Sequence, residues 1–139
     1  MSGIARLLFV SGLAVVGFVV AIFAFQEVPA SECQAQADRN PAYQVRIEPN
    51  PPDVNLTTYT LHVTHAGQPV SGARVCMRAD MGGAGNMSGM GTSALAKQVG
   101  PGRYELGIRF EMGGHWEGRS LIWEGNKSPV EVPVNVEVK

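Results

Sequence analysis

The hydrophobic pattern divides the chain into two unequal parts. From Leu7 to Phe25 no residue carries a charge, and an apolar run of this length is about long enough to cross the hydrocarbon core of a bilayer as a helix. Arg6 precedes the run and Glu27 follows it, so the positive-inside rule places the N-terminus in the cytoplasm. We therefore expect a transmembrane helix within residues 1–26 of a single-pass protein of the bacterial inner membrane, with its C-terminal part in the periplasm.

A cleaved signal peptide is the alternative interpretation of the same run. Residues 28–30 (Val-Pro-Ala) resemble a small-residue cleavage site, but the run is longer than a usual signal core and a proline adjoins the cut. These features favour a retained anchor over a periplasmic module released by cleavage. Within the predicted helix, Gly17 and Ala21 form a small-xxx-small pair that would allow close packing against a helix of another subunit.

Beyond a polar linker at 27–41, the hydrophobic period becomes two, as in half-buried strands. Tyr43, Val45 and Ile47, for example, alternate with polar residues. The same alternation, divided by proline and glycine turns, predicts seven strands, at 43–48, 58–64, 73–78, 92–99, 103–112, 115–124 and 130–138. No amphipathic helix is predicted outside the membrane. We therefore expect residues 42–139 to form an all-β domain, an Ig-like antiparallel β-sandwich of about seven strands preceded by the transmembrane helix.

The chain has two cysteines, Cys33 and Cys76. Both follow the predicted anchor and lie on the oxidising side of the membrane, where cysteines pair by default. Alternation places Val75 and Met77 toward the core and Cys76 on the outer face. A Cys33–Cys76 disulfide would therefore attach the linker to the outer face of the domain.

The segment from Met81 to Gly91 contains five glycines, three methionines and no charged residue. It is too rich in glycine to hold a helix, and it has too few branched residues to pair as a strand. The sequence therefore predicts a loop whose chemistry comes from thioether sulfur.

Two interpretations of these methionines remain open, because thioethers are both soft ligands for Cu(I) and adaptable apolar groups for contact with a partner. The Cu(I) site would draw its ligands from the loop and from a second turn, and these ligands are Met81, Met87, Met90, Met112 and His115. The docking surface would consist of Met81, Met87 and Met90. Alternation also offers a simpler explanation for Met77 and Met112, which is that both are core residues.

Several classes of function are disfavoured by composition and motif. With 11 Lys and Arg against 12 Asp and Glu, the net charge is −1 and the exported part has no basic cluster, which argues against nucleic acid as a partner. No nucleophile elbow or phosphate loop is present. His62 and His65 are separated by an odd number of positions, so a strand would send them to opposite faces. We expect a protein that is not an enzyme.

Three motifs carry a resemblance to a known family. Gly67-Gln-Pro-Val-Ser-Gly-Ala-Arg-Val75, then Pro101-Gly-Arg-Tyr104, then Met112-Gly-Gly-His-Trp116 resemble the FixH/YtkA-like family over about Tyr43 to the C-terminus. The resemblance implies a small extracytoplasmic β-sandwich, often behind one membrane helix. It also implies a link to copper, because the FixH branch is associated with maturation of copper-containing terminal oxidases.

Two hypotheses follow for the function. The first is a membrane-anchored accessory or assembly factor of an extracytoplasmic redox complex, with Cu(I) as the one cofactor in view. The second is a permanent structural subunit of a respiratory or photosynthetic electron-transfer complex, in which the methionine loop docks on protein and holds no metal. In both, the partners are the membrane and the protein subunits of a larger complex.

Overall fold

The computed structural model describes residues 33, 35–81 and 91–139. The predicted membrane helix, with Gly17 and Ala21, and the loop residues Met87 and Met90 lie outside this part of the chain. Within the described ranges, no helix is long and apolar enough to span a membrane. The strands are β1 (Asp38–Arg39), β2 (Tyr43–Glu48), β3 (Thr58–His65), β4 (Gln68–Pro69), β5 (Arg74–Met81), β6 (Gly91–Gly100), β7 (Arg103–Gly107), β8 (Gly114–Trp123), β9 (Val130–Pro133) and β10 (Val136–Val138).

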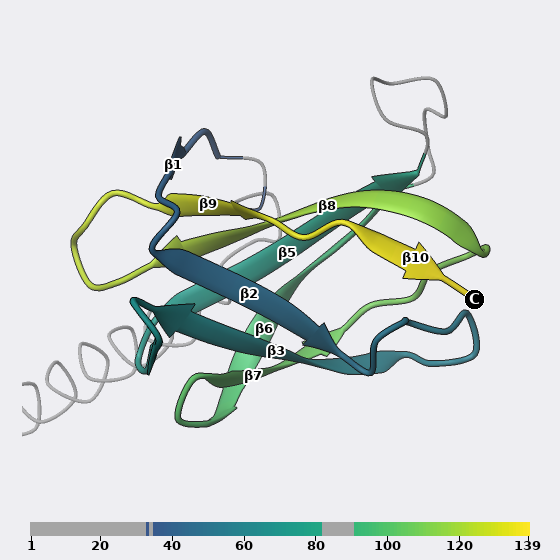
Figure 1. The fold of residues 1–139 in the computed structure, drawn as a ribbon, viewed down its shortest axis with the longest axis horizontal. Coiled ribbons are helices and arrows are strands. Elements are labelled where there is room, and N and C mark those ends of the chain that lie inside the picture. Colours follow the sequence, from purple (N-terminus) through teal and green to yellow (C-terminus); the bar gives the residue numbers. More distant parts are fainter. Residues whose placement is uncertain (1–32, 34, 82–90) are drawn as a thin grey trace, which may run out of the picture.

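All ten strands belong to one curled sheet with the order β1-β9-β8-β5-β6-β7-β3-β2, in which β10 also pairs with β8 and β4 with β3 (Figure 1). The long strand β6 makes the curl. Its first part pairs with β5, from Gly91 opposite Asp80 to Ala96 opposite Val75. Its second part pairs with β7, from Lys97 onward, with a register shift before Gly100. We call the strands on the β5 side half A and those on the β7 side half B.

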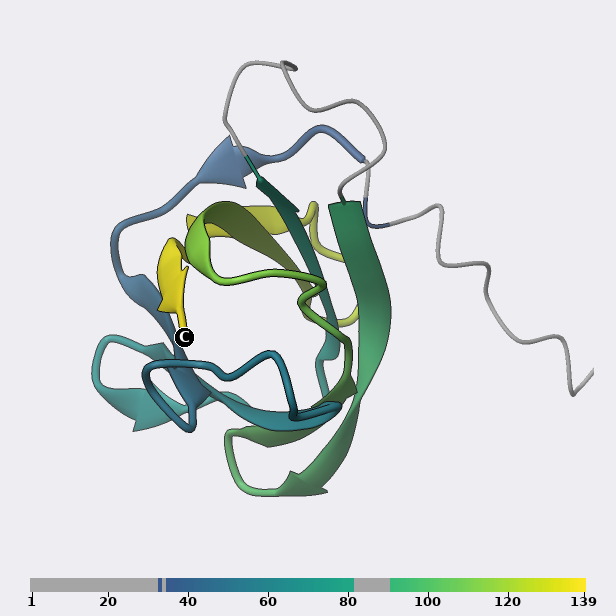
Figure 2. The ribbon, with the colours of Figure 1, turned by 90° about the vertical axis from the view of Figure 1, so that its right-hand side faces the viewer.

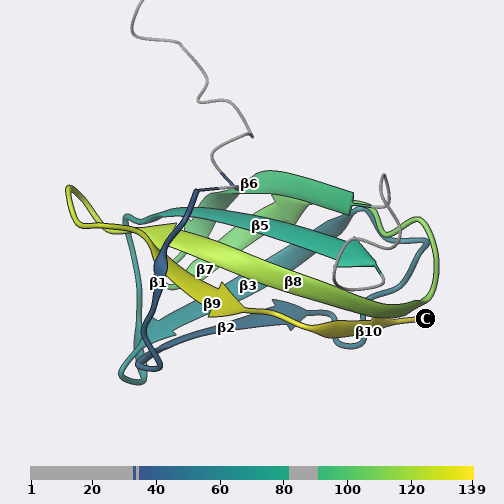
Figure 3. The same ribbon diagram turned by 90° about the horizontal axis from the view of Figure 1, so that it is seen from above.

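The two ends of the curled sheet come side by side. β2 lies beside β9 and β10 in two perpendicular views (Figures 1 and 3), although no ladder joins them. The Tyr43 hydroxyl donates a hydrogen bond to Glu124, just after β8, and so links the two halves. This hydrogen bond raises the pKa of Tyr43, with a further contribution from burial. The tyrosine therefore remains a neutral donor.

Alternation along the strands produces a single core inside the curl. Val75, Met77 and Ala79 of β5 face inward, and so do Trp116 and Ile122 of β8. The opposite side chains form the outer face of half A, which carries Arg74, Cys76, Arg78 and Asp80 of β5 and His115, Glu117, Arg119, Leu121 and Trp123 of β8. Burial of the inward set supplies the main driving force for folding.

The all-β prediction is confirmed, and β6 joins the two halves because its first part pairs with β5 and its second part with β7. The predicted count of about seven strands is too low. The two-residue strands β1 and β4 have no periodicity to detect, and the last predicted strand is interrupted between Pro133 and Val136. There, the Val134 amide donates to the Gly118 carbonyl at 2.8 Å.

The strand predicted at 103–112 ends at Gly107 in the structure. The following residues leave the ladder and cross the open end of the curl (Figure 2). There, Phe110 packs edge-on against Tyr59 and Trp116 at ring-centroid distances of 5.6 and 5.2 Å. Met77 is buried as predicted. The core interpretation of Met112 is wrong, since 42% of that residue is exposed.

The first two motifs that carry the family resemblance form one structural joint. Gly102, at a φ of +64°, lies against Pro69, and its carbonyl accepts a hydrogen bond from Val63 at 2.8 Å. The Tyr104 hydroxyl donates to the Val70 carbonyl at 2.8 Å. The Gly-x-Pro-Val and Pro-Gly-x-Tyr turns therefore serve the fold, because they fix one turn against the other.

Ser120 gives the first prediction, because its side-chain oxygen is buried and has no hydrogen-bond partner within the described residues. Removing a buried, unsatisfied hydroxyl relieves its desolvation penalty. We expect Ser120→Ala to raise the free energy of unfolding by about 1 kcal/mol. Chemical denaturation with an unchanged m-value would measure this gain, and a clear loss of stability would contradict it.

Candidate functional site

The outer face of half A holds the start of the described chain. Cys33 is joined to Cys76 by a disulfide with a Cα–Cα distance of 5.6 Å, and each residue is at most 1% exposed. Leu121, the register partner of Cys76 on β8, is buried on the same outer face. Cys33 therefore lies on the middle of this face, in the arrangement expected from the alternation around Cys76.

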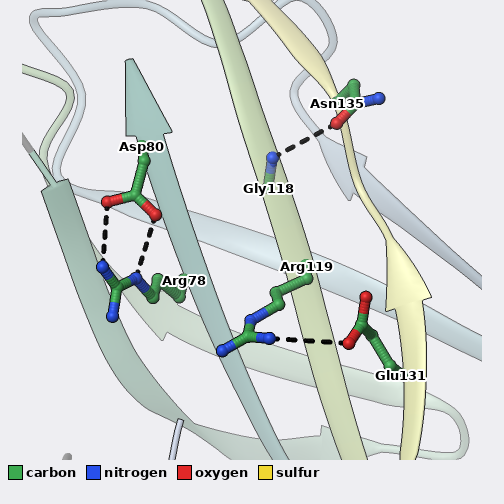
Figure 4. Close-up of polar contacts among 6 residues, drawn as sticks. All are labelled: Arg78, Asp80, Gly118, Arg119, Glu131 and Asn135. Carbon is green, nitrogen blue, oxygen red and sulfur yellow. Dashed lines mark hydrogen bonds and ion pairs between the residues drawn. The ribbon is translucent and has the colours of Figure 1, made fainter. Parts of the chain in front are cut away.

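After the disulfide, residues 35–41, which we call the strap, run across half A to its edge. Within it, β1 pairs in parallel with β9, so the sheet begins before the predicted domain boundary at residue 42. Glu131 of β9 accepts contacts from two arginines, Arg39 of the strap at 3.4 Å and Arg119 of β8 at 3.5 Å. Figure 4 shows the Arg119 contact on the outer face. Only 15% of the Glu131 side chain is exposed, so its charge is largely satisfied by these neighbours.

An open groove of about 470 Å³ lies along the strap. Its lining is mainly polar and comes from the strap, from β8 and β9, and from the turn before β9, with Gln36, Ala37, Asp38, Arg119, Ser128, Pro129 and Glu131. Farther along the same face, Arg78 donates two hydrogen bonds to Asp80, at 2.9 and 3.2 Å (Figure 4). These bonds raise the pKa of Arg78 above its usual value. On this face Arg78 is thus paired with Asp80, and Arg39 and Arg119 with Glu131.

The predicted methionine site falls at one end of the curl, which we call the methionine end and define by Leu56, Met81, Met112 and His115. The ends of β5, β7 and β10 meet the starts of β3, β6 and β8 there (Figures 1 and 2). Leu56 and Met112 are two of the exposed large apolar residues among those described, at 39% and 42%. The structure thus brings Met81, Met112 and His115 to one end of the molecule.

The side chains of this set are already engaged by the protein. Met81 packs partly buried against the core and lies next to Gly114. His115, on the outer face, makes a 2.5 Å contact from Nδ1 to Glu137. Because Met81 and His115 lie on opposite faces of half A, they do not converge on one point. In the described part of the chain, no group of three His, Cys, Asp or Glu residues is placed to hold a metal ion.

Comparison with known families gives the identity of the chain. The model of the YtkA-like family matches residues 38–120, which is more than half of the chain. The chain belongs to the YtkA-like family. The match begins at the strap, runs through both turns of the joint and ends within β8 of this YtkA-like chain. No curated protein and no solved structure matches the chain.

Two features of the YtkA-like chain were missed at the level of sequence. Strand β1 has only two residues, Asp38 and Arg39, and no pattern to reveal it. Trp123 lies on the outer face beneath Arg74, whose guanidinium is 4.5 Å from the ring centroid. The signal for Trp123 in the sequence is its spacing of two from Leu121. Both side chains lie on the side of the strand opposite to Ile122, which faces the core.

Proposed function

We propose that this YtkA-like chain is a membrane-anchored accessory or assembly factor, without enzymatic activity, of a redox complex outside the cytoplasm. The observation that carries the proposal is the attachment of Cys33 to the middle of half A, only seven residues after Gln26. A fully extended chain of that length spans at most about 25 Å. An anchor at residues 1–26 would therefore hold the domain close to the bilayer, within reach of a membrane partner.

The methionine end supports a role in docking. It carries the exposed residues Leu56 and Met112 at the same end of the molecule as Met81, which precedes the neutral loop in the sequence. Exposed apolar side chains are suited to contact with a protein partner, and methionine adapts easily to an irregular surface. We propose that this end contacts a subunit of the complex.

Co-purification tests the proposal. A tagged full-length chain should be recovered from solubilised membranes together with the subunits of one redox complex. Leu56→Asp with Met112→Asp should reduce that recovery several-fold, because charged residues are disfavoured in the core of an interface. A matched control is Gln68→Asp, which alters an exposed residue at the opposite end of β3. Equal recovery of both variants would contradict docking through the methionine end.

A second candidate function is a permanent structural subunit of a respiratory or photosynthetic complex that holds no metal. The engagement of Met81 with the core and of His115 with Glu137 favours it, because these groups are occupied without a metal. Recovery with the mature complex in equal amounts would support this candidate. Recovery only during biogenesis would support the assembly factor.

Copper binding is tested separately. If the loop presents Cu(I), the purified full-length chain takes up the ion under reducing conditions, and Met87→Ala with Met90→Ala lowers its affinity at least about tenfold through loss of two soft ligands. A competition titration with a Cu(I) chelator measures this change. Met77→Leu is the control, since it replaces a thioether inside the core. No uptake, or equal affinity in all variants, would remove copper from the account.

A further inference from the structure

The outer face of half A carries an aromatic and cationic pair near the disulfide. Arg74 and Trp123 are register partners on β5 and β8, and the guanidinium stacks 4.5 Å from the indole centroid. Arg74 is exposed and Trp123 is half-buried. Lys97 of β6 is also exposed, and it lies at about the same position along the strands as Arg74, because the neighbouring Ala96 pairs with Val75. On its other side, Lys97 pairs with Glu105 of β7.

This pair lies close to the point where the chain returns toward its N-terminus. Arg74 is two positions from Cys76, and Trp123 is two positions from Leu121, so each lies roughly 7 Å along its strand from the attachment of Cys33. The pair, the disulfide and the strap all occupy one face. The segment that joins Cys33 to Gln26 spans at most about 25 Å, and it starts from that same face.

We propose that the outer face of half A rests on the lipid headgroups, with Trp123 and Arg74 as the contact. The inference depends on the proposed function, because it requires residues 1–26 to be anchored in the bilayer. Tryptophan is enriched at the boundary between headgroups and acyl chains, and arginine extends its charged end to phosphate while its stem stays in apolar surroundings. The short tether and the disulfide bring these two side chains to that boundary.

The orientation has a consequence for docking. The strands of half A run within the plane of this face, so a face turned toward the bilayer lays the strands along its surface (Figure 3). The methionine end then points sideways instead of away from the membrane. An integral subunit of the same membrane would lie in that direction and could contact the methionine end.

Fluorescence of the full chain in phosphatidylcholine vesicles tests the proposal. The sequence has two tryptophans, and Trp116 is only 1% exposed. When a nitroxide is placed on the lipid headgroup, the wild-type emission should fall, and Trp123→Phe should abolish most of that fall. The component due to Trp123, taken as the difference between the two proteins, should lose about half of its intensity, as expected for an indole at the headgroup level.

Two further measurements separate the outcomes. Flotation of the same vesicles reports on the anchor, and a chain that fails to float would overturn the proposed function as well. A chain that floats while its Trp123 emission is unchanged by the nitroxide would overturn only the headgroup contact.

With Cys33→Ala and Cys76→Ala together, the chain should still float and its Trp123 quenching should fall by about half, because the tether becomes longer and looser. Undiminished quenching would contradict the role given to the disulfide.

Discussion

Replacing Cys33 and Cys76 together with alanine is expected to lower the free energy of unfolding by about 4 kcal/mol. The two cysteines are 43 positions apart, so their bond closes a long loop and restricts the unfolded chain. Both residues are also fully buried, and the bond attaches Cys33 to the outer face of half A opposite the buried Leu121. A loss of this size is a large fraction of the stability of a small domain.

Urea denaturation of the double variant and of the oxidised wild type would measure this difference. The wild type unfolded and refolded with a reductant present should behave like the variant, which separates loss of the bond from loss of the cysteine side chains. If the double variant kept the stability of the oxidised protein, the disulfide would not stabilise the domain in the way described above.

Gly102→Ala is expected to destabilise the domain by about 3 kcal/mol, since it combines an unfavourable φ with a steric clash. A Cβ atom at this position would lie 2.8 Å from the Cβ of Pro69 and 2.9 Å from the carbonyl oxygen of Val63. The backbone φ of +64° adds to the cost for any residue with a side chain. The substitution thus disrupts the contact between the Gly-x-Pro-Val and Pro-Gly-x-Tyr turns.

Gly125→Ala is the matched control for this joint. Its φ of +56° is similar, but no atom lies within 4 Å of an added Cβ. We expect a loss of about 1 kcal/mol there, due to the backbone conformation alone. Thermal or chemical denaturation of both variants would measure the two costs, and equal losses would show that Gly102 is not held against Pro69 and Val63.

Much of the strand pattern could be predicted because alternation reports burial directly. The inward positions of Tyr104 and Leu106 and the outward position of Cys76 all follow from a period of two. The same rule failed at Met112, where residues continue to alternate after the strand has ended. Alternation describes which side a residue faces, but it does not tell whether a neighbouring strand is present to pair with.

The remaining features depend on contacts between distant parts of the chain. The bend of β6 and the pairing of β1 with β9 have no local signature, because each is set by which strand lies alongside. The candidate site shows the same limit. Sequence brought Met112 and His115 into one set by spacing, whereas the structure turns His115 toward Glu137 and leaves Met112 exposed.

Site-specific photo-crosslinking in native membranes tests the central claim most directly. A photoreactive residue placed at Met112 of the full chain should form a crosslink to a subunit of a membrane redox complex, while the same residue at Gln68 at the opposite end should not. Identification of the crosslinked subunit would name the partner. If Met112 and Gln68 gave the same products, or if the chain were recovered from the soluble fraction without residues 1–26, the anchored docking module proposed for this YtkA-like chain would be contradicted.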